Sequence, residues 1–417
     1  MNRRTVAMLL AVCILALLPT AALAADFTDL EGHRAKDAID IWAIMEVLNG
    51  YEDGTFKPDN PITRAELAAV LCRVLGIESY PPRMDPPTFA DVPADAWYHF
   101  PVAALHMNNI MTGDGGGVMR PNDAVSRQEG VMLIARAVHM QSLETPAVPS
   151  PYEDAEDIAD WAADTVDALY RRGHLGWATV DDTFFSPNKA ITRAEVAELL
   201  YSMINFYSKN TGLIDLELVG SYEGNALFNK QLWLRNAAFV GDVILASGIG
   251  DGGVVLEDTD IFGVLHVGGG ERLHLIDEVR FRALRIYREQ LCITAFGNTA
   301  QWLIEEYGNR TSYFLDPTGF VTMYFGNYDF LPTGAMGDTF TKVSIRHETS
   351  LYLDEDMAVE ELEIHTPATI RGQGTVNKLM IHSEGVTLEA GIKVERENIT
   401  LDEGLSVLLG TESYSGG

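Results

Sequence analysis

Residues 49–66 have the sequence NGYEDGTFKPDNPITRAE, in which a glycine-rich turn leads into the start of a helix. Thr63 and Glu66 have the spacing of a capping box, because the threonine hydroxyl can accept from the Glu66 amide while the carboxylate reaches back to the Thr63 amide. Ile62 and Leu67 flank the box as a hydrophobic staple. We therefore expect a helix to begin directly after Thr63.

The Thr-Arg-Ala-Glu box recurs twice farther along the chain, at Ser126–Glu129 and Thr192–Glu195. An aromatic-x-Asp motif repeats with the same spacing of about 62 residues. Its copies begin at Phe27, Phe89 and Tyr152. Two independent motifs that repeat in step indicate three copies of one structural unit.

Each unit has the pattern of a helix, a loop and a second helix, because apolar residues recur at helical spacing on both sides of the loop. In the first unit these residues are Ala38, Ile41, Trp42, Met45 and Leu48 before the loop, and Leu67, Leu71, Val74 and Leu75 after it. Two short helices bury little surface alone, so we expect the three units to pack as one body. Their boundaries are 25–84, 85–148 and 149–208.

Helix capping does not explain the arginine of the box. The arginines are Arg64, Arg127 and Arg193, each at the first helical position, where a positive charge is mildly unfavourable against the helix dipole. A guanidinium beside free amides favours an anion site, which predicts weaker ligand binding for Arg64→Ala with little loss of stability. An ion pair within the chain is the alternative, with Asp29, Asp91 or Asp154. Both interpretations stay open, because one arginine can serve both.

The loop before the first box also suits a ligand. Gly50 and Gly54 let the backbone approach a bound molecule closely, and Tyr51 offers an exposed ring to the face of a sugar. An ordinary turn is the alternative. A calcium loop is disfavoured, because the ligand spacing of an EF-hand is missing.

Four motifs follow one another in each unit, namely aromatic-x-Asp, a tryptophan-bearing helix, the glycine-rich loop and the Thr-Arg-Ala-Glu box. In this order and spacing they resemble the S-layer homology domain, present in three copies over residues 25–208. The resemblance implies a pseudo-threefold, mainly helical body whose grooves bind a secondary cell-wall polysaccharide, often carrying a pyruvate ketal. In some bacteria with an outer membrane the partner is modified peptidoglycan. The implied anion contacts are Arg64, Arg127 and Arg193, with Asp29, Asp91 and Asp154 as groove support. The other implied ligand-binding residues are Trp97, Trp161, Gly50, Tyr51 and Gly54.

The three units depart from the family pattern in different ways. The first has Arg34 where the helix tryptophan is expected. The second replaces the loop by Gly113–Gly117, and the third stretches it through Gly176, Trp177 and Asp181. The three grooves are therefore expected to differ in their competence to bind.

Residues 1–24 have the pattern of a secretory signal, with Arg3 and Arg4 before an apolar core and a small-x-small site at Ala22–Ala24. The apolar core is shorter than the roughly 20 residues that cross a bilayer. We therefore expect cleavage and a secreted protein of the cell wall and cell surface, with no membrane span in the mature chain.

The composition limits the partners further. The formal net charge is −30, and it becomes −32 once the two signal arginines are lost, which argues against nucleic acid as a partner. Cys72 and Cys292 lie among apolar residues, so they are expected to be buried thiols rather than parts of a disulfide framework or a zinc site.

From about Thr211 onward, short alternating strands replace the helical pattern, and we assign residues 209–417 to one β-rich surface region. Ala368–Val376 together with Val386–Leu388 resembles a coil of a β-solenoid, and similar segments follow S-layer homology modules in other surface proteins. An irregular β-sandwich is the alternative. A helix is expected within residues 281–308.

The β-rich region contains no clear catalytic pattern. His266 and His274 lie near Glu271 and could suggest a metal site, although histidines in strands are more often structural. The nucleophile motif G-x-S-x-G does not occur. We expect a non-catalytic, surface-layer-associated region that needs no cofactor or metal and is able to self-associate. The alternative is an anchored polysaccharide-degrading enzyme, since β-solenoids also host lyases.

Overall fold

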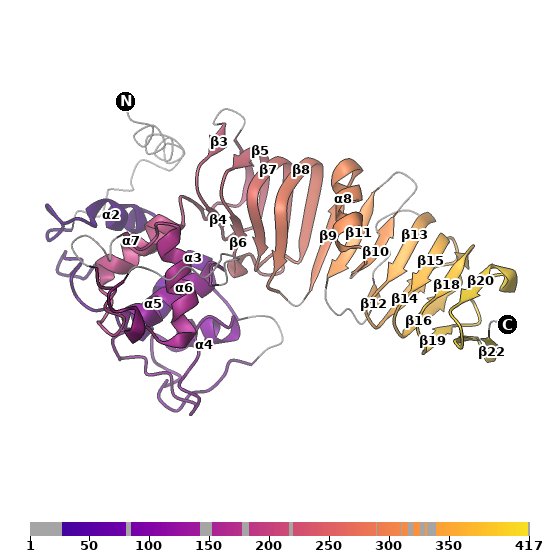
Figure 1. Ribbon diagram of the computed structural model, residues 1–417, viewed down its shortest axis with the longest axis horizontal. Coiled ribbons are helices and arrows are strands. Elements are labelled where there is room, and N and C mark those ends of the chain that lie inside the picture. Colours follow the sequence, from indigo (N-terminus) through magenta and orange to yellow (C-terminus); the bar gives the residue numbers. More distant parts are fainter. Residues whose placement is uncertain are drawn as a thin grey trace.

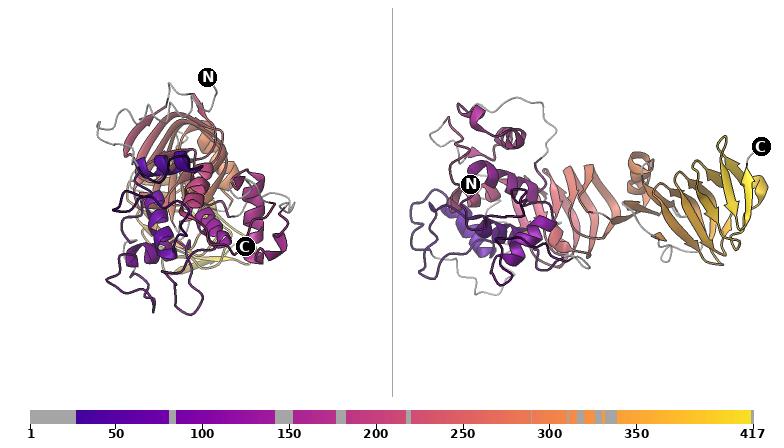
Figure 2. Two further views of the ribbon diagram at one scale, coloured as in Figure 1. Left: turned by 90° about the vertical axis from the view of Figure 1, so that its left-hand side faces the viewer. Right: turned by 90° about the horizontal axis from the view of Figure 1, so that it is seen from below.

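The computed structural model describes residues 27–80, 85–141, 152–176, 183–216, 220–288, 290–309, 311–315, 320–325, 330–331 and 339–415. The expected signal at 1–24, and the loop residues Trp177 and Asp181, lie outside these ranges. The chain forms a helical body followed by a long rod of β-structure (Figure 1). The right-hand view of Figure 2 shows from below that the rod extends away from the body, with the C-terminus at its far end, and the left-hand view looks along the rod from the side of the body.

The helical body contains two α-helices from each of the three repeats, as the sequence predicts. They are α2 (Lys36–Ile44) and α3 (Arg64–Leu75), α4 (His99–Met107) and α5 (Arg127–Ala137), and α6 (Asp160–Arg171) and α7 (Arg193–Met203). A short 3-10 helix, η1 (Ala155–Asp157), precedes α6.

The second helix of every repeat begins at a complete capping box, which confirms the prediction from the sequence. At α3 the Glu66 amide donates to Thr63 Oγ1 over 3.2 Å, and the Thr63 amide donates to Glu66 Oε2 over 2.8 Å. The helix ends at Gly76, whose φ of 69° is the left-handed conformation that glycine adopts without strain.

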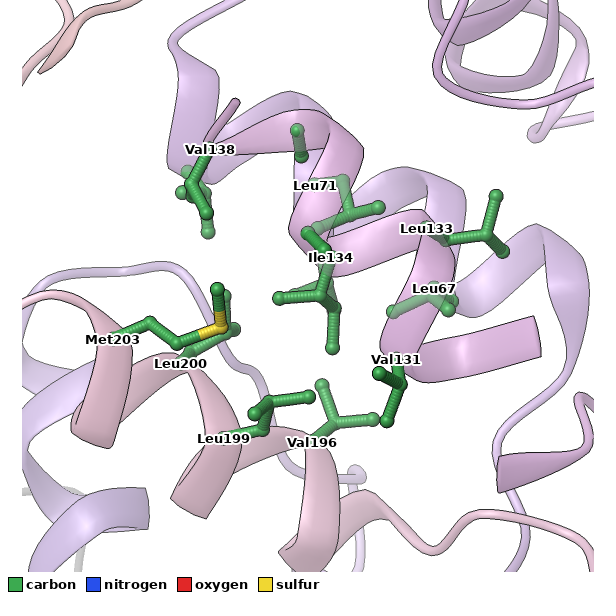
Figure 3. Close-up of a cluster of buried hydrophobic side chains, with 14 of the residues drawn as sticks. Leu67, Leu71, Val131, Leu133, Ile134, Val138, Val196, Leu199, Leu200 and Met203 are labelled. Carbon is green, nitrogen blue, oxygen red and sulfur yellow. The ribbon is translucent and has the colours of Figure 1, made fainter. Parts of the chain in front are cut away.

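Helices α3, α5 and α7 share the centre of the body, where their apolar side chains face one another (Figure 3). Those without solvent exposure include Leu67, Leu71, Val131, Ile134, Val196, Leu199, Leu200 and Met203. The segments before the helices close a ring of backbone hydrogen bonds. The amide of Ile62 donates to Ile191, that of Ile191 to Val125, and that of Val125 to Ile62, over 2.9 to 3.1 Å. The three repeats therefore form one pseudo-threefold unit.

This centre also explains why the second repeat lacks a hydrophobic staple. Gly130 occupies the position of the staple partner, and a Cβ atom there would lie 2.9 Å from Cδ1 of Ile191. The third repeat's isoleucine thus fills the space that a side chain of the second repeat would need. The missing staple results from packing between repeats.

The rod is a β-solenoid, as the sequence predicts, and not the β-sandwich. Its first strands are β1 (Phe206–Ser208), β2 (Gly212–Asp215), β3 (Ser221–Tyr222), β4 (Ala226–Phe228), β5 (Leu232–Phe239), β6 (Val243–Leu245), β7 (Gly253–Val267), β8 (Arg272–Ile286) and β9 (Leu291–Ala295). The middle strands are β10 (Ser312–Leu315), β11 (Val321–Phe325), β12 (Phe330–Leu331) and β13 (Thr339–Ile345). The last are β14 (Thr349–Leu353), β15 (Ala358–Ile364), β16 (Ala368–Gly372), β17 (Thr375–Val376), β18 (Leu379–Ile381), β19 (Val386–Leu388), β20 (Ile399–Leu401), β21 (Ser406–Leu409) and β22 (Glu412–Ser415).

Strands of successive coils pair in parallel at both ends of the rod. Near the helical body β5 pairs with β7 and β7 with β8, and near the C-terminus β14 pairs with β16 and β16 with β19. An antiparallel section, β9-β11-β10-β13, joins the two parallel parts. Helix α8 (Gly297–Tyr307) packs on β8 and β9. The helix expected within 281–308 is therefore present, while residues 281–286 belong to β8. Two 3-10 turns, η3 (Ser247–Ile249) and η4 (Arg396–Asn398), lie in connections.

Ladders of aliphatic side chains fill the rod, because parallel pairing places equivalent residues of successive coils above one another. Leu234 pairs with Leu256, which pairs with Leu275, and all three are buried. Leu362 and Leu379 stack in the same way near the C-terminus.

The first coils of the rod pack directly on the helical body. Leu227, Ile244 and Ala246 belong to the same buried cluster as the helix residues. Tyr207 of β1 meets the ring of Trp42 edge-on, with 5.4 Å between the ring centres. The helical body and the beginning of the solenoid therefore share one hydrophobic core.

Candidate functional site

The box arginines hold neighbouring repeats together. Arg64 Nε donates to the carbonyl of Met119 over 2.8 Å, and its Nη2 donates to the carbonyl of Thr112 over 3.0 Å. Arg193 makes the equivalent bonds to Phe56 and Asn49, over 2.9 and 2.7 Å. Repeat 1 is thus bound to repeat 2, and repeat 3 to repeat 1.

Arg127 completes the cycle from repeat 2 to repeat 3. Its Nη1 donates to the carbonyl of Phe185 over 2.8 Å, and its Nη2 lies 2.6 Å from Oε1 of Glu195. All three arginines are nearly buried, with 5 to 7% exposure. Each therefore has a structural role at the boundary between two repeats.

The aspartates accept from the loop of their own repeat. Asp29 accepts from the amides of Phe56 and Lys57 over 2.8 and 2.7 Å. Burial acts to raise the pKa of Asp29, but these two amide bonds outweigh it and hold the pKa below its usual value. Asp91 and Asp154 make the same pair of bonds in repeats 2 and 3. These aspartates support the loops that border the grooves.

Four of the predicted ligand-binding residues come together in one hollow of about 150 Å³, which we call groove 1. They are Gly50, Tyr51, Trp97 and Arg193. The remaining lining residues are Leu48, Asn49, Glu66, Ala69, Val70 and Arg73. All three repeats contribute, because Tyr51, Trp97 and Arg193 belong to repeats 1, 2 and 3. Gly54 does not line this hollow.

The ring of Tyr51 contacts two cations, Arg193, which also lines groove 1, and Lys57, which does not. Lys57 Nζ is 4.0 Å from the ring centre, and the guanidinium carbon of Arg193 is 5.0 Å from it. Both distances suit a cation–π contact. Trp97 is 63% exposed, so its indole face is free to stack on a sugar ring. Groove 1 therefore combines aromatic surface with positive charge.

Arg73 is a lining residue that the sequence analysis did not identify. It lies in the last turn of α3 and donates through Nη1 to the carbonyl of Val47 over 2.8 Å. Burial lowers the pKa of Arg73, Cys72 acts to raise it, and the charge of Arg193 lowers it. A basic residue in the last turn of a helix normally complements the helix dipole. The sequence therefore offers no signal that Arg73 lines a groove.

The second repeat boundary keeps the arginine and the exposed tryptophan of groove 1, whereas the third boundary has lost both. At the second boundary, Arg136 donates to Ile110 as Arg73 does to Val47, and Trp161 is 53% exposed. At the third, Arg34 takes the place of the tryptophan and lies 3.2 Å from Glu198. At this third boundary Ser202 occupies the position that Arg73 has in groove 1. Of the departures read from the sequence, Arg34 therefore falls at a groove position.

The histidines singled out in the solenoid do not form one site. His266 Nδ1 lies 3.1 Å from the hydroxyl of Tyr287, and His274 Nδ1 lies 2.7 Å from that of Thr294. His274 pairs with Val255, eleven residues before His266 on the same strand. Both histidines make side-chain contacts between neighbouring coils.

Among the described residues, one group of carboxylates is close enough to share a cation, formed by Glu257, Asp258 and Asp277. Cys72 is buried and Cys292 half-buried, and neither forms a disulfide. Burial raises the pKa of Cys72 to about 12 and that of Cys292 to about 11. None of the helices in the described part of the chain has the length and apolar character needed to cross a membrane.

The family model of the S-layer homology domain matches residues 26–68, 88–129 and 151–197. An amylopullulanase of Thermoanaerobacterium thermosulfurigenes is 31% identical over 182 residues, which cover 43% of this chain and 9% of that protein. The exoglucanase XynX of Acetivibrio thermocellus is 29% identical over 180 residues, 43% of this chain and 16% of its own length. The surface-layer 125 kDa protein of Lysinibacillus sphaericus is 30% identical over 185 residues, 44% of this chain and 15% of its own. The aligned part is thus a small fraction of each relative.

Proposed function

Because the chain carries three S-layer homology domains, which hold proteins on the cell wall at the bacterial surface, we propose that groove 1 binds an anionic polysaccharide of that wall. The observation that carries the proposal is the meeting of Trp97, Tyr51 and Arg193 in one hollow. A carboxylate on the sugar would face Arg193 and Arg73, while the sugar ring stacks on the indole. Arginine suits this role, because its planar fork matches a carboxylate.

Groove 1 is the strongest of the three repeat boundaries for this ligand. At the third boundary the partner of Arg127 is the buried carboxylate of Glu195, and Arg34 is engaged by Glu198. At the second, Glu129 lies 3.6 Å from Arg64 and 3.3 Å from Arg120. Arg193 and Arg64 both donate to carbonyl oxygens, but among the described residues no carboxylate lies within ion-pair distance of Arg193, so its positive charge is less compensated.

The test is binding of the full secreted chain to purified sacculi, with sacculi stripped of polysaccharide by acid as the blank. Trp97→Ala is expected to weaken binding about tenfold, because the stacking surface is lost, and to leave the melting temperature unchanged. The matched control is Phe262→Ala, since Phe262 is equally exposed at 63% but lies on β7 of the solenoid. Equal retention of wild type and Trp97→Ala on intact sacculi would overturn the assignment of groove 1.

We further propose that the β-solenoid is non-catalytic and serves as a surface-layer-associated part of the protein. Charged side chains one coil apart pair with one another along the surface of the rod, so these side chains have partners within the protein. Arg280 lies 2.6 Å from Asp260, and Lys342 lies 2.8 and 2.7 Å from Glu361 and Glu363. The full chain is expected to release no reducing sugar or unsaturated product from wall or plant polysaccharides, and release of either would contradict this proposal.

An anchored polysaccharide-degrading enzyme is the alternative, and the carboxylates of Glu257, Asp258 and Asp277 are the observation that favours it. Product release by wild type that is abolished in Asp277→Asn would support the enzyme. The names of the glycan-degrading relatives carry little weight here, because this chain covers at most 16% of the two enzymes described above.

A further inference from the structure

A second hollow adjoins groove 1 at the junction between the helical body and the solenoid. It has a volume of about 470 Å³, and we call it the junction hollow. It shares three lining residues with groove 1, namely Ala69, Arg73 and Trp97. The two hollows are therefore continuous along one side of α3, and the exposed indole of Trp97 borders both.

The far side of the junction hollow is made by the first coils of the solenoid. Tyr207, Lys209, Asn229 and Lys230 line it from the β region. We propose that the polysaccharide groove continues from Arg193 past Trp97 into the junction hollow, where Lys209 and Lys230 bind further anionic sugars of the same polymer. This inference rests on the proposed function of groove 1.

The charge distribution supports an anionic occupant. Acidic residues outnumber basic ones by 60 to 30 in the chain, yet the two hollows together are lined by four cations, Arg193, Arg73, Lys209 and Lys230, and three carboxylates. A cationic track on an acidic protein concentrates a polyanion there and repels it from the rest of the surface.

The two lysines are held by partners that a polymer can replace. Lys230 Nζ lies 2.7 Å from Glu78, whose side chain is 77% exposed, and Lys209 pairs with Glu46, whose side chain is 80% exposed. Ion pairs with such exposed carboxylates contribute little to stability. An incoming sugar carboxylate can therefore take the place of either glutamate without loss to the fold.

The floor of the junction hollow carries a polar group suited to a sugar hydroxyl. Asn229 is 1% exposed, and its Nδ2 donates to the carbonyl of Val74 and to the hydroxyl of Tyr207, each over 2.9 Å. Its Oδ1 is buried and has no hydrogen-bond partner among the described residues. A buried acceptor left unpaired is unfavourable, so a donor from a bound ligand that reaches it would be stabilising.

The experiment measures binding of the full secreted chain to anionic polysaccharide released by acid from purified sacculi, as single repeating units and as long polymer. The double variant Lys209→Gln, Lys230→Gln is expected to bind long polymer about fivefold to tenfold more weakly and single units as wild type does. The matched control is Lys378→Gln with Arg396→Gln, which removes two exposed cations near the C-terminal end.

A second double variant tests the same inference through an expected gain in affinity for long polymer. Glu46→Gln with Glu78→Gln releases both lysines from their partners, so long polymer is expected to bind more tightly. Unchanged affinity for long polymer in both double variants would overturn the continuation while leaving groove 1 intact. By contrast, single units that bind Trp97→Ala as tightly as wild type would overturn groove 1 itself, and the continuation with it.

Discussion

Arg127 and Glu195 show that part of the recurring box is structural in this molecule. The two side chains lie 2.6 Å apart and are only 8 and 5% exposed. Glu195 also accepts from the amide of Thr192 over 3.0 Å, as part of its capping box. One carboxylate thus serves both the cap of α7 and the contact between repeats.

Removing Arg127 should be costly for this reason. Arg127→Ala leaves the Glu195 charge buried with its main partner gone, and we expect a loss of about 3 kcal/mol in the free energy of unfolding. Chemical denaturation of the full chain measures it. Arg280→Ala is the control, because Arg280 pairs with Asp260 on the open surface and its loss should hardly change stability. Equal stability of the two variants would contradict the buried-pair argument.

The effect of Arg64 is now expected to differ from the prediction made on sequence grounds. Its guanidinium donates to the carbonyls of Met119 and Thr112, so Arg64→Ala should lower stability as well as any binding.

The helix cap can be tested separately. Thr63→Ala is expected to cost about 1 kcal/mol, with Ser126→Ala as its equivalent in repeat 2. A change below the error of denaturation in both variants would show that the boxes are dispensable.

At the scale of elements, the turn η3 depends on close backbone contact with the end of α3. A Cβ atom on Gly248 would lie 2.1 Å from the carbonyl oxygen of Leu75 and 2.4 Å from Gly76. Gly248→Ala should therefore push the first coils away from the helical body, with a loss of about 1–3 kcal/mol. Gly253→Ala is the matched control, since nothing lies within 4 Å of a Cβ there. Denaturation midpoints that fall equally would contradict the close contact.

A buried histidine makes the same junction sensitive to acid. The ring of His139, just after α5, stacks on Tyr287 with 3.7 Å between centres, and His266 lies 6.2 Å away. Burial, assisted by the charge of His266, lowers the pKa of His139 to about 3. The unfolded chain binds a proton near pH 6.5 and the folded chain does not, so stability is lost as the pH falls from about 6.5 toward 3.

The variant His139→Phe should remove the part of that dependence that is due to His139 while keeping the stacked ring, and the part due to His174, whose pKa burial lowers to about 4, should remain. The slope of unfolding free energy between pH 6.5 and 4 is expected to flatten. A loss below about pH 4 should remain, because Asp242 lies at the same junction. Burial acts to raise its pKa, but bonds from His266 and Val264 lower it to about 2. His382→Gln, near the C-terminal end, is the control. An unchanged slope in His139→Phe would exclude His139 as the group that titrates.

At the scale of the whole molecule, the helical body is incomplete without the first coils. Leu227, Ile244 and Ala246 of the β region complete its buried cluster. The fragment 25–208 lacks these three residues and should therefore unfold at lower denaturant than the same body in the full chain, with helical circular dichroism as the readout. A midpoint equal to that of the full chain would show that the body folds independently of the rod.

Much of the fold was predictable because its signals are local. The capping boxes, the loop glycines and the spacing of Phe27, Phe89 and Tyr152 are properties of short segments that repeat, and they predicted the helical unit and its copy number. The solenoid was predicted from alternation in segments such as Ala368–Val376, because parallel coils need only a repeated apolar position. Gly130 could not be explained in this way, because the side chain that leaves no room for a Cβ atom there belongs to Ile191, sixty-one residues away.

The sequence by itself determined the three repeats and their caps, favoured a β-solenoid over a β-sandwich, and supplied the residue types of the proposed polysaccharide site. Only the tertiary structure decided which of those residues meet. It joined Arg193 of repeat 3 with Tyr51 of repeat 1 and Trp97 of repeat 2, added Arg73, and placed Lys209 and Lys230 in the adjoining junction hollow. The physical reason is that caps and alternation arise from neighbours in the chain, whereas a groove between repeats depends on side chains far apart in sequence that packing brings together.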